Sequence, residues 1–165
     1  CVESLKQWPG LNAELRDGAV VYKKHYDFGI AVGGGKGLVV PVVRNVDQLS
    51  LAEIEKEIAR LAGRAKDNKL TLEELQGGTF TISNQGSIGG SHFTPIIYAP
   101  QVAILGVGQG QAKPVAIDGK IAIRTIVPLC LAYDHRVLDG ADAVRFLKDV
   151  IAGLEAFDEA DLKLK

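Results

Sequence analysis

An almost wholly apolar run, QVAILGVG at residues 101–108, constrains the fold of this chain more than any other feature. Strands that are covered on both faces of a sheet typically lack alternating polar residues. We therefore expect this segment at the centre of a sheet, with other parts of the chain packed above and below it. A second strand is predicted just upstream, where β-branched and aromatic residues gather in TFTIS at residues 79–83.

Two further parts of the sequence predict strands. Residues 17–43 read as three strands, of which the first opens at Asp17-Gly18. Glycines at positions 33–35 and 37 separate the second of these strands from the third. Downstream of the apolar run, Asp118-Gly119 is a turn signal between KPVAI and KIAIRTIVPLCLAY, and this pattern predicts a β-hairpin.

Helical periodicity is clearest over residues 50–66. Ser50 and Glu53 form a capping-box signature at the start of this helix. Its apolar residues recur every three or four positions and therefore share one face, at Leu51, Ile54, Ile58, Leu61 and Ala65.

Two more helices complete the pattern. Thr71 and Glu74 repeat the capping-box signature and predict a short helix that ends at Gly77-Gly78. A last helix is expected over residues 141–156, where the apolar residues form one stripe. This mixed order of strands and helices predicts an α/β or α+β fold, with a large mixed sheet flanked by helices.

Size and composition fit a single globular domain. A chain of 165 residues can bury its own core, and 47% hydrophobic against 24% charged residues is typical of a folded protein. The net charge of −1 gives no indication of nucleic-acid binding, and no apolar run is long enough to predict a membrane span. The first residues, CVESLKQW, read as a helix without a capping residue, so we expect that this chain was cut from a longer one.

Cysteine and histidine spacing predicts no metal site. Cys1 and Cys130 match neither a disulfide framework nor a set of metal ligands, which favours a reducing compartment. His25 and His92 likewise have no partner at ligand spacing.

The segment YDHRVLDG at residues 133–140 holds the strongest candidate for chemistry. His135 follows an apolar strand and precedes a turn into a helix, which is a useful position for a general base. A histidine in such a turn can also be purely structural. Asp134 and Arg136 are interpreted as a local ion pair, whereas Asp139 either positions His135 or caps the last helix.

Ser83 and Asn84 end the strand TFTIS and lead into a glycine-rich loop. This loop has the spacing of neither a phosphate-binding P-loop nor a dinucleotide fingerprint. A serine at a strand end can donate a hydrogen bond to an oxyanion, although such a serine more often makes a structural hydrogen bond. The sequence has no GxSxG elbow, and Cys130 lies in an apolar strand, so no covalent protein nucleophile is predicted. We therefore expect direct transfer between two bound substrates.

Four blocks in this order, GLVVPVVRNVD, GGTFTISNQGSIGG, FTPIIYAPQVAILGVG and YDHRVLDGADAVRFL, closely resemble one family. It is the catalytic domain of the dihydrolipoamide acyltransferases, the core components of 2-oxo acid dehydrogenase complexes. The HxxxDG element within HRVLDG is also shared with chloramphenicol acetyltransferase, whose fold the resemblance implies. Residues 1–165 are then expected to form a partial catalytic domain without roughly its first quarter, and without the lipoyl and peripheral-subunit-binding domains.

The resemblance implies that an acyl group passes from the sulfur of a dihydrolipoyl arm to the thiol of coenzyme A, without a metal. His135 matches the general base of the family, Ser83 its oxyanion-stabilising hydroxyl and Asp139 the acidic or amide residue of the signature. Asn84 and Phe93 are expected to contact the substrate. The lipoyl group would be carried on a separate domain. The loop SNQGSIGG followed by FTPII favours acetyl as the acyl group, with branched-chain acyl and succinyl groups as alternatives.

The resemblance also implies an assembly. In this family the site lies between neighbouring subunits of a homotrimer, one giving the histidine and the next the serine, and trimers build cores of 24 or 60 chains. The expected partners are a lipoyl domain, a 2-oxo acid decarboxylase and dihydrolipoamide dehydrogenase, in the bacterial cytoplasm or the mitochondrial matrix. The charged tail EAFDEADLKLK at residues 155–165 does not match an assembly helix.

Two other interpretations stay open at this point. The first is an acetyltransferase of the same fold that acts on a small hydroxyl compound such as an antibiotic. The second is a scaffold that forms the core of the complex without turnover.

Overall fold

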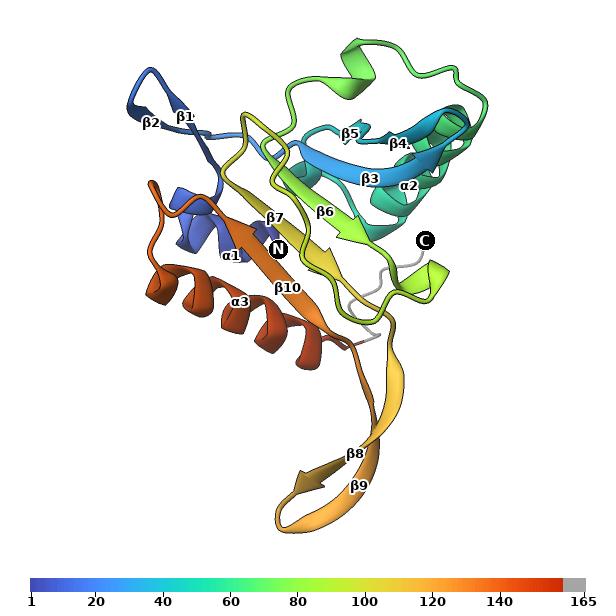
Figure 1. The fold of residues 1–165 in the computed structure, drawn as a ribbon, viewed down its shortest axis with the longest axis vertical. Helices are drawn as coiled ribbons and strands as arrows, with labels where there is room; N and C mark the ends of the chain where they lie inside the picture. Colours follow the sequence, from blue (N-terminus) through green and yellow to red (C-terminus); the bar gives the residue numbers. More distant parts are fainter. Residues whose placement is uncertain (159–165) are drawn as a thin grey trace.

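The computed structural model describes residues 1–158 and centres on one mixed sheet of six strands (Figure 1). The strands lie in the order β10-β7-β6-β3-β4, and β5 also pairs with β3. β6 runs parallel to both β3 and β7, whereas β10, β4 and β5 are antiparallel to their neighbours. The strand bounds are β3 Phe28–Gly34, β4 Gly37–Val39, β5 Val42–Val43, β6 Phe80–Asn84, β7 Ala103–Val107 and β10 Leu129–Tyr133. The predicted large mixed sheet is confirmed. The charged tail from position 159 onward lies outside the described residues.

Three helices supply the layer that covers the sheet. They are α1 Val2–Gln7, α2 Leu51–Lys66 and α3 Gly140–Glu155. Phe80 of β6 is fully buried, and its ring lies 5.7 Å from that of Phe28 and 5.9 Å from that of Phe146 on α3. Leu5 of α1 and Leu61 of α2 belong to the same buried cluster. All three helices therefore contribute to one hydrophobic core.

The capping box predicted for α2 is formed. The hydroxyl of Ser50 accepts a hydrogen bond from the backbone N–H of Glu53, and the Glu53 carboxylate accepts one from the backbone N–H of Ser50. The Ser50 hydroxyl also donates a hydrogen bond to the Glu53 carboxylate, and this bond, followed by the one from the Ser50 backbone N–H, holds the pKa of the Glu53 carboxyl below its usual value. The sequence signature and the start of the helix thus coincide.

Alternation along the strands divides their side chains between two faces. Ser83 pairs with Gly106 of β7, and Gly106 pairs with Cys130 of β10. Paired residues point to the same face of a sheet, so these three share a face, and it is opposite to that of Phe80. The small side chains on this second face leave room for other groups to approach.

Two hairpins extend from the central sheet (Figure 1). The first joins β1 Ala13–Arg16 to β2 Ala19–Tyr22, and the second joins β8 Gln111–Ile117 to β9 Lys120–Ile126. The second hairpin was predicted, with its turn at Asp118-Gly119. The expectation for Asp17-Gly18 was wrong in one respect, because this pair is the turn between two strands and does not open the first of them. Both turn residues have positive φ, as tight hairpin turns require.

Two other expectations need correction. The segment after Thr71 forms only a 3-10 turn, Glu73–Leu75, although Thr71 and Glu74 do exchange the predicted hydrogen bonds. The Glu74 carboxylate also binds arginines of α2, which ties the segment down without a longer helix. The strand predicted to run through KIAIRTIVPLCLAY is broken at Pro128, since proline has no N–H for the sheet. Other 3-10 turns span Pro9–Leu11, Val46–Gln48 and Gly86–Ile88. Within residues 1–158, no helix has the length and apolar character needed to cross a membrane.

Candidate functional site

His135 lies in the turn between β10 and α3, with its side chain exposed. Its ring centroid is 5.7 Å from that of Tyr133, the last residue of β10. Within the described part of the chain the imidazole forms no hydrogen bond. The predicted placement at the end of a strand is confirmed, and both ring nitrogens are open to other molecules.

An ion pair between Asp134 and Arg136 holds this turn on either side of His135. The Asp134 carboxylate accepts hydrogen bonds from the backbone N–H of Arg136 at 3.0 Å and from its guanidinium at 2.6–3.2 Å. The guanidinium contributes most to lowering the pKa of Asp134 to about 2, and the backbone N–H adds to this effect. The pKa of Arg136 is raised in return. The predicted ion pair is confirmed, and it restricts the backbone that carries His135.

Asp139 caps the helix that follows. Its carboxylate accepts a hydrogen bond of 2.9 Å from the backbone N–H of Asp142, in the first turn of α3. Of the two structural roles considered for Asp139, the structure therefore shows the helix cap. Leu138, one residue earlier, is buried in the core and fixes the entry into the helix.

Ser83 lies near the end of β6 and is half-buried. Within residues 1–158 its hydroxyl forms no hydrogen bond. The structural hydrogen bond that a serine at a strand end often makes is therefore not observed here. The next residue, Asn84, is exposed, and its Oδ1 accepts a hydrogen bond of 2.9 Å from the backbone N–H of Gly86. Asn84 thus shapes the start of the loop after β6.

The loop after β6 folds back over the open face of the sheet. A Cβ atom placed on Gly106 would lie 3.0 Å from Cζ of Phe93 and 3.2 Å from Pro95. One placed on Gly108 would overlap the carbonyl oxygen of Ser91. Glycine at both positions therefore allows this close approach. The structure brings Phe93 next to Gly106 and hence near Ser83, which pairs with Gly106.

His135 and Ser83, in contrast, are not brought together within one chain. Ser83 shares a row of the sheet with Cys130, whereas His135 lies beyond Tyr133 at the other end of β10 (Figure 1). The three residue steps from Cys130 to Tyr133 span about 10 Å, and two strand spacings of about 4.8 Å separate β6 from β10. A single copy cannot place both side chains on one reacting group.

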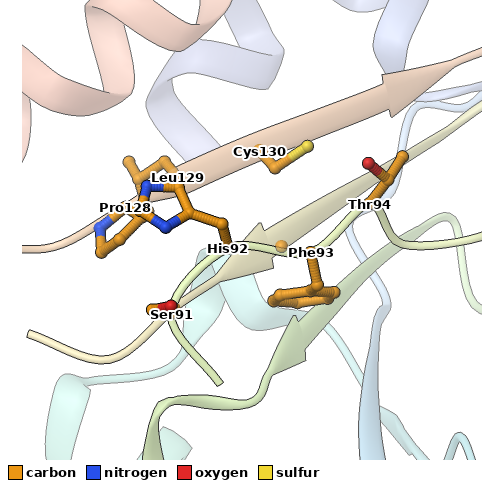
Figure 2. A pocket seen from close by; sticks show the side chains of 9 residues that line it. Ser91, His92, Phe93, Thr94, Pro128, Leu129 and Cys130 are labelled. Atoms are coloured by element: carbon orange, nitrogen blue, oxygen red, sulfur yellow. The ribbon is translucent and has the colours of Figure 1, made fainter. Parts of the chain in front are cut away.

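A cavity lies on this open face (Figure 2), and one of the residues that line it is Gly106, which pairs with Ser83. Its volume is about 370 Å³, at the lower end of the range for small-molecule sites. The lining residues are Ser91, His92, Phe93, Thr94, Gly106, Gly108, Pro128, Leu129 and Cys130. Cys130 and His92 had been considered only as a buried thiol and a lone histidine. Period-2 alternation along β10 shows which of its own residues share a face, but only the register of the sheet places Cys130 on the face of Ser83.

Metal-ligating groups do not gather anywhere in residues 1–158. No group of three or more histidine, cysteine, aspartate or glutamate side chains there has an arrangement that could hold a metal ion.

Comparison with known proteins gives one consistent family. The family model described as the catalytic domain of 2-oxoacid dehydrogenases acyltransferase matches residues 1–162. A succinyltransferase component of the 2-oxoglutarate dehydrogenase complex from Bartonella vinsonii subsp. berkhoffii is 52% identical over 92% of this chain. The corresponding component from Bacillus subtilis is 53% identical over 88% of it. The chain spans 37% and 35% of the lengths of these two relatives.

Solved structures show the same similarity. The dihydrolipoamide acetyltransferase of Azotobacter vinelandii matches with a TM-score of 0.92 and 47% identity, over 98% of this chain and 67% of that one. A cubic core of a pyruvate dehydrogenase multienzyme complex matches with a TM-score of 0.91 and the same identity and coverage. Chloramphenicol acetyltransferase, at 16% identity and a TM-score of 0.54, covers 90% of this chain and 71% of its own and shares the fold alone.

One detail of the Azotobacter protein bears on the site. A serine, a histidine and an asparagine have been investigated for their roles in its catalytic mechanism, and they are separated by 52 and then 4 residues. Ser83, His135 and Asp139 are separated by the same intervals of 52 and 4 residues. With the family model matching nearly the whole chain and the fold of its solved members reproduced, this chain belongs to the family of 2-oxoacid dehydrogenase acyltransferase catalytic domains.

Proposed function

We propose that this chain is the catalytic part of an acyltransferase that moves a succinyl group from a dihydrolipoyl sulfur to the thiol of coenzyme A. The observation that carries the proposal is the free, exposed imidazole of His135, in a turn braced by Asp134 and Arg136. Such a base takes a proton from a thiol without a nucleophile from the protein. Residues 1–165 would serve as the catalytic unit, and the lipoyl group would be delivered on a separate domain.

The proposed reaction has two steps, addition of the thiolate to the thioester and expulsion of the dihydrolipoyl sulfur. His135 removes the proton from the coenzyme A thiol, and the thiolate sulfur forms a bond to the carbonyl carbon of the acyl-dihydrolipoyl thioester. The carbonyl oxygen becomes an oxyanion, to which Ser83 donates a hydrogen bond. The bond between that carbon and the dihydrolipoyl sulfur then breaks, and the departing sulfur takes the proton back from His135. The intervals shared with the Azotobacter serine and histidine support these two roles.

Asp139 acts as a positioning residue in this proposal. Its hydrogen bond to the backbone N–H of Asp142 holds the start of α3, and the turn that carries His135 ends there. An asparagine follows the histidine at the same interval in the Azotobacter protein, and an asparagine side chain can accept the same hydrogen bond. Asn84 and Phe93 are proposed to contact the substrate, since Asn84 ends β6 next to Ser83 and Phe93 lies on the following loop, against Gly106, which pairs with Ser83.

The complete site is proposed to form between copies of the chain in a homotrimer. The separation of His135 from Ser83 within one copy supports this arrangement, because a neighbouring copy can bring its own serine to the histidine. The β8–β9 hairpin gives independent support. One of its faces carries only small and apolar side chains together with Thr125, and Ile121 and Ile123 on this face are 83% and 62% exposed. An isolated two-stranded hairpin is marginal in water, so contact with a second copy would stabilise it.

A larger assembly of trimers and binding of a lipoyl domain, a 2-oxo acid decarboxylase and dihydrolipoamide dehydrogenase complete the proposal. One of the matching structures is a cubic core of a multienzyme complex, which supports an assembly of many copies.

The choice of succinyl as the acyl group departs from the sequence-based preference for acetyl. That preference is not confirmed, since the relatives cited above at 52% and 53% identity are succinyltransferase components. Acetyl is kept as the second candidate because the Azotobacter acetyltransferase is 47% identical. The two identities are close, so a direct assay must decide between the acyl groups.

The test uses the full chain with coenzyme A and dihydrolipoamide thioesters of succinyl, acetyl and isobutyryl groups. We expect the largest kcat/KM with the succinyl thioester, and loss of about 10²–10⁴-fold in rate on His135→Ala. The mass in solution is measured for both proteins, and the variant should keep the assembly of the wild type. If no acyl group were transferred from any of the three thioesters, the proposed reaction would be wrong and the chain would be a non-catalytic scaffold.

A further inference from the structure

The backbone of His135 is held on both sides. The N–H of Asp134 donates a hydrogen bond of 2.8 Å to the carbonyl oxygen of Val102. The carbonyl oxygen of Asp134 accepts hydrogen bonds from the N–H groups of Val137 and Leu138, at 3.0 and 3.1 Å. The imidazole itself has no hydrogen bond within residues 1–158. The freedom that is left to His135 is therefore rotation about the two bonds of its side chain.

This rotation matters for a general base. The χ1 torsion of a histidine has three staggered wells and its χ2 torsion is roughly two-fold, so an unrestrained imidazole spends about one sixth of the time in any one orientation. Proton transfer needs a ring nitrogen within hydrogen-bond distance of the thiol, and a displacement of about 1 Å can cost about 10²-fold in rate. A group that restricts the imidazole of His135 to one orientation therefore raises kcat.

The aromatic ring of Tyr133 lies against this imidazole. The two ring centroids are 5.7 Å apart, and the ring planes are inclined by 38°. Aromatic pairs in contact have centroids about 4.5–7 Å apart, so this separation is that of an interacting pair. The contact covers one side of the imidazole and leaves its nitrogen atoms without a partner among the described residues.

Tyr133 is itself fixed in place. It pairs with Ala103 across β10 and β7, and its half-buried ring packs against the hydrophobic core. A Cβ atom placed on Gly140, the first residue of α3, would lie 3.6 Å from the hydroxyl oxygen of Tyr133. The side chain therefore reaches from the end of β10 to the start of α3. Its hydroxyl forms no hydrogen bond in the part of the chain that the structure describes.

We infer that Tyr133 is a positioning residue for the general base, and that its ring keeps the imidazole of His135 in the orientation that accepts the thiol proton. The ring is the part that acts, because the hydroxyl has no partner within residues 1–158. The inference rests on the proposed function, since it states how the base of that reaction is held.

The kinetic test compares Tyr133→Phe with Tyr133→Leu in the assembled full chain. Phenylalanine keeps the ring, so kcat should stay within about twofold of the wild type. Leucine has no aromatic ring, and we expect it to lower kcat about 3- to 10-fold, which is the factor that an aromatic pair contributes. The KM for coenzyme A should change by less than about twofold, because the orientation of the base affects proton transfer and not binding.

Leu131→Ala is the matched control for loss of packing. Leu131 lies two residues before Tyr133 on β10, on the same face of the strand, and packs against the same core. Its truncation should lower the free energy of unfolding at least as much as Tyr133→Leu and leave kcat close to that of the wild type. Denaturant unfolding measures the first quantity. An equal loss of kcat in Leu131→Ala, or in Tyr133→Phe, would overturn the inference.

A second readout does not depend on turnover. Crystal structures of the wild type, Tyr133→Phe and Tyr133→Leu show the electron density of the His135 imidazole directly. We expect a single orientation in the first two proteins and more than one in the leucine variant. A single and unchanged orientation in the leucine variant would also overturn the inference, because something other than the ring of Tyr133 would then restrict the imidazole.

The two readouts separate failure of the inference from failure of the proposed function. If His135→Ala abolished acyl transfer while Tyr133→Leu kept the wild-type kcat, His135 would remain the base and Tyr133 would not position it. If the wild type transferred no acyl group, the proposed function would fail. Additional orientations of the imidazole in Tyr133→Leu would even then support the positioning role of the ring.

Discussion

Ser83 and His135 lie at opposite ends of the central sheet, two strands apart, in the same chain. Each side chain is free of hydrogen bonds within the described residues, so each is available to a group from outside its own copy. The active site is therefore expected to combine the serine of one copy with the histidine of another.

Mixing two inactive variants should restore activity. Ser83→Ala keeps the histidine and His135→Ala keeps the serine, so a mixed trimer contains some interfaces with both intact groups. Random reassembly of equal amounts should regain about one quarter of the wild-type sites, because each site needs the right copy on both sides. Activity is measured after joint unfolding and refolding, with each variant alone as the control. A mixture no more active than its components would place the whole site within one copy.

Variants of Asp139 should show whether its role depends on capping α3 or on its negative charge. Asp139→Ala removes the acceptor for the backbone N–H of Asp142 and should lower the free energy of unfolding by about 1 kcal/mol. Asp139→Asn keeps an acceptor oxygen and should stay close to the wild type in both stability and kcat. Denaturant unfolding and the kcat of each variant check this expectation. Strong loss of kcat in the asparagine variant, with stability intact, would mean that the negative charge itself is needed.

Acid should weaken the turn that carries His135. The pKa of Asp134 is held at about 2, against an ordinary value of 3.8, mainly by its hydrogen bonds from the Arg136 guanidinium. Because the folded pKa is the lower one, this group adds stability above about pH 4, and that stability is lost as the pH falls toward 2. Asp134→Asn should therefore flatten the pH dependence of the melting temperature between pH 4 and 2 and leave its slope above pH 5 unchanged. If the melting temperatures of both proteins fell equally between pH 4 and 2, other carboxyl groups would dominate the loss of stability in acid.

The apolar face of the β8–β9 hairpin should be required for assembly. Ile123→Lys places a charge on this face, where Ile123 is 62% exposed in a single copy. Burial of an unpaired lysine is costly, so we expect the mass in solution to shift toward the monomer and the activity to fall with it. Ile117→Lys, on the opposite face of the same hairpin, is the matched control and should assemble normally. Light scattering during gel filtration measures both, and equal masses for the two variants would exclude this face as the interface.

Local sequence patterns predicted most of the helices and strands. The capping box of Ser50 and Glu53, the apolar stripe behind it and the hairpin turn at Asp118-Gly119 all have the expected structure. These features depend on hydrogen bonds and periodicities among residues close in sequence, and neighbouring residues are enough to specify them. The same holds for Asp139, whose capping bond reaches only three residues ahead.

Tertiary structure decided what those local patterns could not. The strand order β10-β7-β6-β3-β4 places Ser83, Gly106 and Cys130 in one row, although 47 residues separate the first from the last. The cavity lined by Gly106, Gly108 and Cys130 exists because a loop packs across that row against glycines that have no side chain to exclude it. The sequence by itself determined which residues are candidates for chemistry and which elements carry them. Only packing between distant segments decided that Phe93 lies near Ser83 while His135 does not, because such contacts depend on the register and direction of strands far apart in the chain.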